Sequence, residues 1–252
     1  MTTSQLVHLQ AADGIATITL DSQHNRNALS KQLVTELAEA LATADGDDTV
    51  RAVLLTAAGT VFCSGADLSE AKDGGMEQGA HALVALQRQI LASAKPVVIR
   101  LHGPVRAGGL GLVGAADIVI AADTVTFAFT EARLGLAPAL ISLTTLPRMT
   151  SRAAARTFLT AESFDATTAA EVGLITEAVP ADRLDVTVAG VLEQLTQASP
   201  QGLRESKALI AAPLLANIDA HGVEMAELSA RLFGSDEAKA AMQAFLERKK
   251  RS

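Results

Sequence analysis

Two glycine-containing loops constrain this chain most, because each connects a short apolar strand to a helix. The apolar run in Arg51–Ala57 predicts a buried strand, the loop of residues 58–66 follows it, and a helix is expected near Met76–Ser93. A second buried strand is predicted at Val97–Leu101, before a loop that ends in Gly108-Gly109-Leu110-Gly111. The repeated order of strand, glycine loop and helix predicts an α/β fold with short crossover connections.

The N-terminal part of the chain predicts a β-hairpin and then an amphipathic helix. Apolar residues alternate or cluster in Gln5–Gln10 and Gly14–Leu20, and Asp13-Gly14 between them is a typical hairpin turn. Ser30 is suited to cap the helix, because its side-chain oxygen can accept a hydrogen bond from a free N–H of the first turn. We expect this helix to reach about Ala44.

The second half of the chain changes from strands to helices. Strands are predicted at Asp117–Ala121 and Val125–Phe129. From Ala139 onward the pattern is mostly helical, with a short strand near Leu174–Ala178.

A chain of 252 residues fits one large domain, or a domain with a smaller appendage. The sequence SPQG near residues 198–201 interrupts the helical pattern, so we expect a core of residues 1–197 and a helical region of residues 198–252. Because 49% of the residues are apolar and only 19% are charged, the chain can form a large core and is not disordered.

Composition and charge exclude several classes of protein. No apolar run reaches the ~18 residues that a membrane span needs, and no basic segment followed by an apolar one marks a secretory signal. Cys63 is the single cysteine, so an internal disulfide framework is excluded. The net charge of −7 and the absence of Trp and Tyr disfavour nucleic-acid binding. We therefore expect a cytoplasmic protein that binds neither membranes nor nucleic acids.

The glycine loops also carry the first candidate chemistry. The segments Cys63-Ser64-Gly65-Ala66-Asp67-Leu68 and Ala107-Gly108-Gly109-Leu110-Gly111 each precede a helix, where unpaired N–H groups and a partial positive charge are exposed. Glycine lets a ligand approach the backbone closely. Two N–H groups that face each other from these loops could hold a developing oxyanion, although glycine at such a junction more often serves the turn alone.

The order and spacing of several motifs favour an oxyanion-binding role for these loops over a turn alone. The chain contains, in order, RAVLLTAAG, FCSGADL, KPVVIRLHG, AGG, ADIVIAAD, FAFTEARLGLAP, LPR and ARTFLTAESFDATTAAEVGLITEAV. Over roughly residues 5–250, this order resembles the crotonase family, which is the enoyl-CoA hydratase/isomerase superfamily. The most specific signal is SGADL followed about forty residues later by HG and AGG.

This resemblance implies a crotonase-like (ClpP/crotonase) spiral of strand–strand–helix repeats, with a C-terminal helical region that mediates trimerisation. Family members commonly form trimers or dimers of trimers, so the same assemblies are implied here. By position, Ala66 and Gly108 match the two backbone donors that hold the thioester carbonyl of an acyl-CoA substrate. Each such donor can be worth ~3 kcal/mol in a transition state. No separate cofactor and no metal are implied, because coenzyme A is part of the substrate.

The resemblance also implies a set of contacts to coenzyme A. The matching residues are Arg26, Ala28, Ser64, Asp67, Leu68, Phe245 and Arg248. The first two belong to the loop that packs on the nucleotide, and Asp67 and Leu68 flank a backbone donor and are expected to seat the pantetheine arm. The last two belong to the final helix, which in the family reaches toward the coenzyme A of a neighbouring subunit. Simple helix packing is the alternative for Phe245.

The groups that handle protons depart from the family pattern. Hydration in the family uses two glutamates, and the first of these positions is Gly111, which has no side chain to ionise. The second position is Glu131. A single carboxylate can remove a proton from one carbon and return it to another, as in the isomerisation of a 3-enoyl to a 2-enoyl thioester. Burial beside Phe129 and Leu136 is expected to raise the pKa of Glu131, and the alternative is a solvated loop carboxylate.

Five other side chains are further candidates for the missing acid or for contacts to the substrate. Asp67 adjoins the first donor but matches a structural or ligand-seating position, while Glu70 and Asp73 lie in a segment that could enter the pocket. His102 begins a turn and is expected to serve it. Arg106 is an unusual charge in its loop, and it faces solvent, a phosphate of coenzyme A or an acidic acyl tail.

The favoured function is an acyl-CoA enzyme with a single-glutamate proton shift, as in an enoyl-CoA isomerase. The alternatives are an enoyl-CoA hydratase with an unidentified second acid, an acyl-CoA decarboxylase, and an acyl-CoA-binding subunit with little turnover. Metal catalysis is disfavoured because the five histidines lack ligand spacing, and a serine hydrolase built on Ser64 lacks a well-placed histidine. The apolar segment Leu136–Leu146 lines the acyl pocket or packs in the core.

Overall fold

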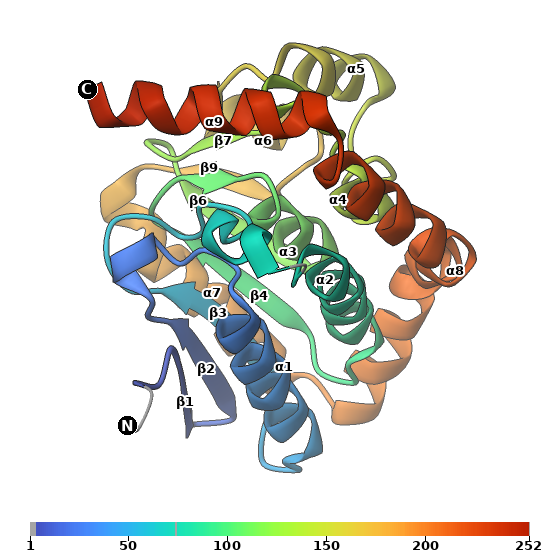
Figure 1. Ribbon diagram of the computed structural model, residues 1–252. Coiled ribbons are helices and arrows are strands. Elements are labelled where there is room, and N and C mark those ends of the chain that lie inside the picture. Colours follow the sequence, from blue (N-terminus) through green and yellow to red (C-terminus); the bar gives the residue numbers. More distant parts are fainter. Residues whose placement is uncertain (1–3, 74, 252) are drawn as a thin grey trace.

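A six-stranded sheet forms the centre of the molecule (Figure 1). The computed structural model describes residues 4–73 and 75–251, without the side chains of residues 71–73, 75, 245, 246 and 248–251. The β1–β2 pair is antiparallel and the later neighbours are parallel, which confirms the predicted α/β fold. In spatial order, the strands are β1 (Val7–Ala12), β2 (Ile15–Leu20), β3 (Ala52–Ala57), β4 (Val97–Leu101), β6 (Ile118–Ala122) and β9 (Glu177–Val179).

A second, small sheet lies next to the glycine loops. It contains β5 (Val105–Arg106), β7 (Thr126–Ala128) and β8 (Phe164–Asp165), in the order β5-β7-β8. β5 and β8 were not predicted, because a strand of two residues shows no alternation of apolar and polar side chains. The predicted strand near Leu174–Ala178 begins later than expected, at Glu177.

Helices surround the large sheet, and the first of them begins as predicted. The Ser30 side chain accepts a hydrogen bond from the N–H of Leu33, and the buried face of this helix includes Leu33 and Leu37. No helix in the described ranges is both long and apolar enough to span a membrane. The helices are α1 (Lys31–Gly46), α2 (Gly75–Ala92), α3 (Gly109–Ala115), α4 (Ala139–Thr145), α5 (Ser151–Thr160), α6 (Ala166–Glu171), α7 (Leu184–Gln197), α8 (Pro200–Phe233) and α9 (Asp236–Arg251), with short 3₁₀ helices η1 (Gln23–Asn25), η2 (Leu68–Asp73), η3 (Glu131–Leu134) and η4 (Ala181–Arg183).

The long helix α8 packs against α2 and α4, and α9 returns across the molecule to contact η3 (Figure 1). The predicted interruption near residue 198 is the break between α7 and α8. The helical region thus packs on the core of its own chain, and the division into two domains at this break stays a prediction.

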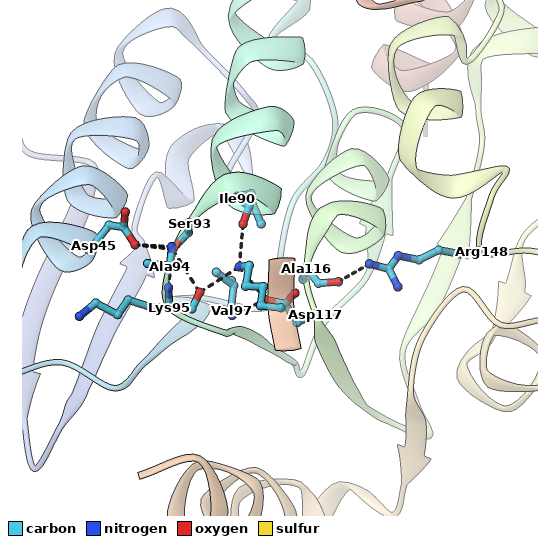
Figure 2. A network of polar contacts seen from close by, with 10 residues as sticks. Asp45, Ile90, Ser93, Ala94, Lys95, Val97, Ala116, Asp117 and Arg148 are labelled. Carbon is cyan, nitrogen blue, oxygen red and sulfur yellow. Dashed lines mark hydrogen bonds and ion pairs between the residues drawn. The ribbon is translucent and has the colours of Figure 1, made fainter. Parts of the chain in front are cut away.

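A buried ion pair attaches α8 to the sheet. The Lys207 ammonium is 3% exposed and lies 2.8 Å from a carboxylate oxygen of Asp117. It also donates hydrogen bonds to the carbonyls of Ile90 and Lys95, at 2.8 and 2.9 Å. The Asp117 carboxylate accepts a further bond from the N–H of Val97, at the start of β4 (Figure 2). Every group of this cluster is therefore paired, as a buried charge requires.

Candidate active site

The two glycine loops lie against each other, as the site requires. The N–H of Arg106 donates to the carbonyl of Cys63 at 2.9 Å, and the backbones run parallel at this point. A methyl group built on Gly65 would lie only 3.0 Å from the Ala107 Cβ, and one built on Gly109 would lie 2.8 Å from the Cys63 Cβ. Gly65 also has a φ of +98°, which favours glycine. These glycines therefore permit the close approach of the two loops.

The N–H groups of Ala66 and Gly108 lie at the point where the loops meet. A Cβ built on Gly108 would be 3.7 Å from the Ala66 nitrogen. Neighbouring N–H groups are used internally, since Leu29 donates to Gly65 and Ala107 donates to Ala128. Within the described part of the chain, no acceptor pairs with the N–H of Ala66 or of Gly108. Two backbone donors without an acceptor therefore lie close together where the loops meet.

A cavity of about 500 Å³ brings these donors together with the predicted carboxylate. Ala66, Gly108 and Glu131 all line it. The first part of the segment Leu136–Leu146 also lines this cavity, together with Leu83, while Leu143 is buried in the core. The cavity lining therefore combines polar groups of the loops with apolar side chains, as is typical of sites for small ligands.

Glu131 is the first residue of η3, and its carboxylate is enclosed. The Oε2 atom is buried and has no hydrogen-bond partner among the described residues. Burial raises the pKa of Glu131 to about 7. The predicted direction of the shift is confirmed, and the alternative of a solvated loop carboxylate is wrong. A carboxylate with a pKa near neutrality is suited to both accept and return a proton.

The raised pKa of Glu131 makes a prediction about stability. Below about pH 4.5 this group is protonated in both the folded and the unfolded chain, so its contribution to stability is fully present. As the pH rises to about 7, the unfolded chain ionises first, and the contribution of at most about 3 kcal/mol is lost. The Glu131→Gln variant has no such titration. The wild type should therefore lose stability relative to the variant as the pH rises from about 4.5 to about 7, which melting temperatures measured across this range would show. A difference in melting temperature that does not change with pH would contradict the raised pKa of Glu131.

The space beside Gly111 is occupied by other parts of the chain. A Cβ built there would lie 3.0 Å from Ile141 Cγ2 and 3.1 Å from the Gln87 side-chain amide. Gln87 is fully buried, donates to the carbonyl of Leu140 at 3.2 Å, and accepts from the hydroxyl of Thr144 at 2.8 Å. A neutral, hydrogen-bonded amide therefore fills the space beside Gly111, the position where the resemblance implies a glutamate. The sequence held one signal for Gln87, which is a polar residue on the core face of an apolar helix.

The other candidates for an acid are held in structural contacts. Although burial acts to raise it, the pKa of Asp67 is lowered by hydrogen bonds from Ser69 and Asn25. Glu70 accepts from the N–H of Lys31 at 3.0 Å, at the start of α1. The His102 ring nitrogen Nε2 lies 2.9 Å from a loop carbonyl. The side chain of Asp73 lies outside the described residues.

The residues matched to coenzyme A contacts are only partly brought together. Arg26, Ser64 and Leu68 line the 500 Å³ cavity, whereas Asp67 lines an adjoining cavity of about 520 Å³. Ala28 is buried and belongs to neither lining. The predicted contacts Phe245 and Arg248 lie in α9, and their side chains are outside the described residues.

Two further alternatives can be compared with the structure. The Ser64 hydroxyl donates to the carbonyl of Asn25 at 3.0 Å rather than to a histidine, so the serine hydrolase is not assembled. In the described ranges, no three His, Cys, Asp or Glu side chains converge as metal ligands would. Burial raises the pKa of the Cys63 thiol to about 12, so this thiol is unreactive at neutral pH.

One part of the site comes from α8 and was not predicted from the sequence. Ser229 and Phe233 line both cavities. Helical periodicity shows which face of such a helix is apolar, but it does not show which distant loop that face meets.

Comparison with known proteins relates the whole chain to one family. A family model described as enoyl-CoA hydratase/isomerase matches residues 10–252. A Thermus thermophilus protein named as an enoyl-CoA hydratase is 30% identical over 204 residues, which cover 79% of this chain and 81% of that protein. The crystal structure of an enoyl-CoA hydratase from Mycobacterium avium has a TM-score of 0.91 at 47% identity and covers 98% of both chains. One from Mycobacterium smegmatis has a TM-score of 0.80 at 26% identity and covers 97% of both chains.

Proposed function

Because the chain belongs to the enoyl-CoA hydratase/isomerase family and has the crotonase fold, we propose that it binds an acyl-CoA thioester and moves a proton on the acyl group with Glu131. The observation that carries this proposal is one enclosed carboxylate in the same cavity as two unpaired N–H groups. No further cofactor is needed for this chemistry, because coenzyme A enters as part of the substrate.

The thioester carbonyl accepts hydrogen bonds from the N–H groups of Ala66 and Gly108. These donors stabilise the negative charge that develops on the oxygen when a proton leaves the adjacent carbon. Glu131 removes the proton from C2 of a 3-enoyl thioester, and the resulting dienolate receives the same proton at C4. The double bond then lies between C2 and C3, and the carboxylate is regenerated. A pKa of about 7 for Glu131 suits both transfers.

The surroundings of Gly111 favour this proton shift over hydration. Hydration needs one group to activate water and a source for the proton that is added to the neighbouring carbon. Of the described residues that line the cavity, Glu131 alone carries a carboxylate. Gln87 and Ile141 fill the space beside Gly111, so no other carboxylate takes the place of the missing one from that side.

The relatives named as enoyl-CoA hydratases support hydration as the second candidate function. Parallel assays of the purified protein with 3-enoyl-CoA and trans-2-enoyl-CoA separate the two functions. We expect isomerisation of the first substrate to be faster than hydration of the second. Fast hydration that is largely lost in Glu131→Gln would instead support the hydratase and require a second acid. Tight binding of both substrates without turnover would support an acyl-CoA-binding subunit.

Gly111→Ala tests whether the space beside this residue is filled. The new methyl group would lie 3.0–3.1 Å from Ile141 and Gln87, so we expect a loss of about 1–3 kcal/mol in the free energy of unfolding from overpacking. Gly190→Ala is the matched control, because a Cβ there meets nothing within 4 Å inside α7. The control should be neutral or stabilising by up to about 1 kcal/mol. Chemical denaturation measures both, and equal effects would contradict a closed space at Gly111.

We also propose that the chain forms a homotrimer or a dimer of trimers. Support comes from the family and from apolar side chains that α8 exposes, since Leu209 is 79% and Ile210 is 62% exposed. Light scattering should give the mass of a trimer or a hexamer, and a monomer at micromolar concentration would contradict the assembly.

A further inference from the structure

We infer that Arg106 holds an anionic oxygen of the bound acyl-CoA at a subsite away from the reacting carbons. This oxygen belongs to a phosphate of coenzyme A or to a carboxylate on the acyl group. The inference rests on the proposed function, because the ligand is the same thioester. The sequence alone leaves three possible contacts open for the Arg106 side chain: solvent, a phosphate of coenzyme A and an acidic acyl tail.

The guanidinium of Arg106 is fixed in place by the small sheet. Arg106 ends β5 and lines the 500 Å³ cavity together with Ala66 and Gly108. Its Nη1 donates to the carbonyls of Val105 (2.9 Å) and Thr126, and its Nη2 donates to the Thr126 hydroxyl at 2.7 Å. A guanidinium has five N–H donors in a rigid fork. The Nε donor and one Nη2 hydrogen therefore remain without an acceptor among the described residues.

Arg106 also has no acidic partner in the part of the chain that the structure describes. Burial lowers the pKa of its guanidinium, and no neighbouring carboxylate opposes this effect. By contrast, Arg88 and Arg100 each lie within 2.7 Å of an aspartate oxygen. A half-buried charge without a counter-charge is unfavourable, and an anionic ligand with two acceptor oxygens would offset this cost.

The position of the guanidinium separates it from the proton transfer. Val105 pairs with Phe127 and Arg106 pairs with Ala128, so the contacts to Thr126 direct the side chain toward the start of β7, whereas Glu131 follows the end of β7. The pKa of Glu131 is set by burial and not by an arginine. Arg106 is therefore a binding residue for a remote group of the substrate.

The charge of the cavity lining supports an anionic ligand. Three arginines, Arg26, Arg106 and Arg133, line a cavity in which Glu131 is the one acidic residue described. The whole chain carries a net charge of −7, so this concentration of positive charge is local. A cleft with one sign of charge attracts ligands of the opposite sign.

The test is calorimetric titration of Arg106→Met in the Glu131→Gln background, which prevents turnover of the ligand. The ligands are but-2-enoyl-CoA, its 4-carboxy derivative, and but-2-enoyl-pantetheine, which has no phosphates. Loss of a charge-assisted hydrogen bond should weaken binding by about 10- to 100-fold. A phosphate contact predicts this loss for both CoA thioesters and none for the pantetheine thioester. An acyl carboxylate contact predicts the loss for the 4-carboxy derivative alone.

Two variants complete the test. Arg106→Lys keeps the charge without the fork, so an intermediate loss is expected. Arg156→Met removes the same charge from α5, outside the cavity lining, and should leave all affinities unchanged. Equal affinities of the Arg106→Met variant and its parent, or an equal loss in Arg156→Met, would overturn the subsite and leave Arg106 as a structural link between β5 and β7. If the parent binds no CoA thioester at all, the proposed function itself fails.

Discussion

Glu131→Gln should lower turnover by about 10²- to 10⁴-fold, because the proposed mechanism routes the proton through this carboxylate and the amide cannot accept it. The substitution keeps the shape of the side chain, and the N–H groups of Ala66 and Gly108 are unchanged, so acyl-CoA affinity should be nearly retained. Steady-state kinetics with 3-enoyl-CoA and a binding titration measure the two quantities separately.

Glu39→Gln provides the matched control, because Glu39 is exposed on α1 and lines neither cavity. It makes the same carboxylate-to-amide change and should leave turnover unchanged. The pH profile adds an independent check. Since the base must be ionised, kcat/KM should rise as the pH increases through about 7 and then level off. Retained turnover in Glu131→Gln would refute the assignment of this group as the proton carrier.

Lys207→Met should destabilise the protein by about 3–5 kcal/mol, because it removes the ion-pair partner of the Asp117 carboxylate, whose side chain is only 13% exposed. The carbonyls of Ile90 and Lys95 lose a donor as well. For a chain of this length, the expected fall in melting temperature is about 6–20 °C. Differential scanning calorimetry measures the fall directly.

The exposed pair of Arg88 and Asp219 is the natural comparison, because it too holds α8 to the rest of the molecule, in this case through α2. Arg88→Met should change the melting temperature little, since solvent screens that pair. The double variant Lys207→Met with Asp117→Asn removes both buried charges and should recover part of the lost stability. Equal effects of the Lys207 and Arg88 variants would show that burial does not govern the ion pair.

The sequence could predict those parts of the site that lie within short motifs at the ends of strands. Ala66 and Gly108 follow from their loops, and Glu131 follows from its place in the family order. The structure brings all three to one cavity. The direction of the Glu131 pKa shift could also be predicted, because the flanking residues Phe129 and Leu136 are apolar and buried.

What could not be predicted depends on contacts between distant segments. Gln87 fills the space at Gly111 from α2, and Ser229 and Phe233 reach the cavities from α8. Local periodicity places these residues on a helix face but does not identify the surface that the face meets. The role of Lys207 was hidden for a similar reason, because lysine is rarely buried and its partner Asp117 is far away in the sequence.

Ser229 and Phe233 of α8 form part of the cavity wall, and this has a consequence for biosynthesis. The loops that carry Ala66 and Gly108 leave the ribosome long before Phe233, whose side chain closes part of the same cavity. A nascent chain can therefore form most of its sheet while the ligand site is still open on one side. The cavity wall is completed only after α8 has left the exit tunnel, so the finished ligand site is among the last parts of the chain to form.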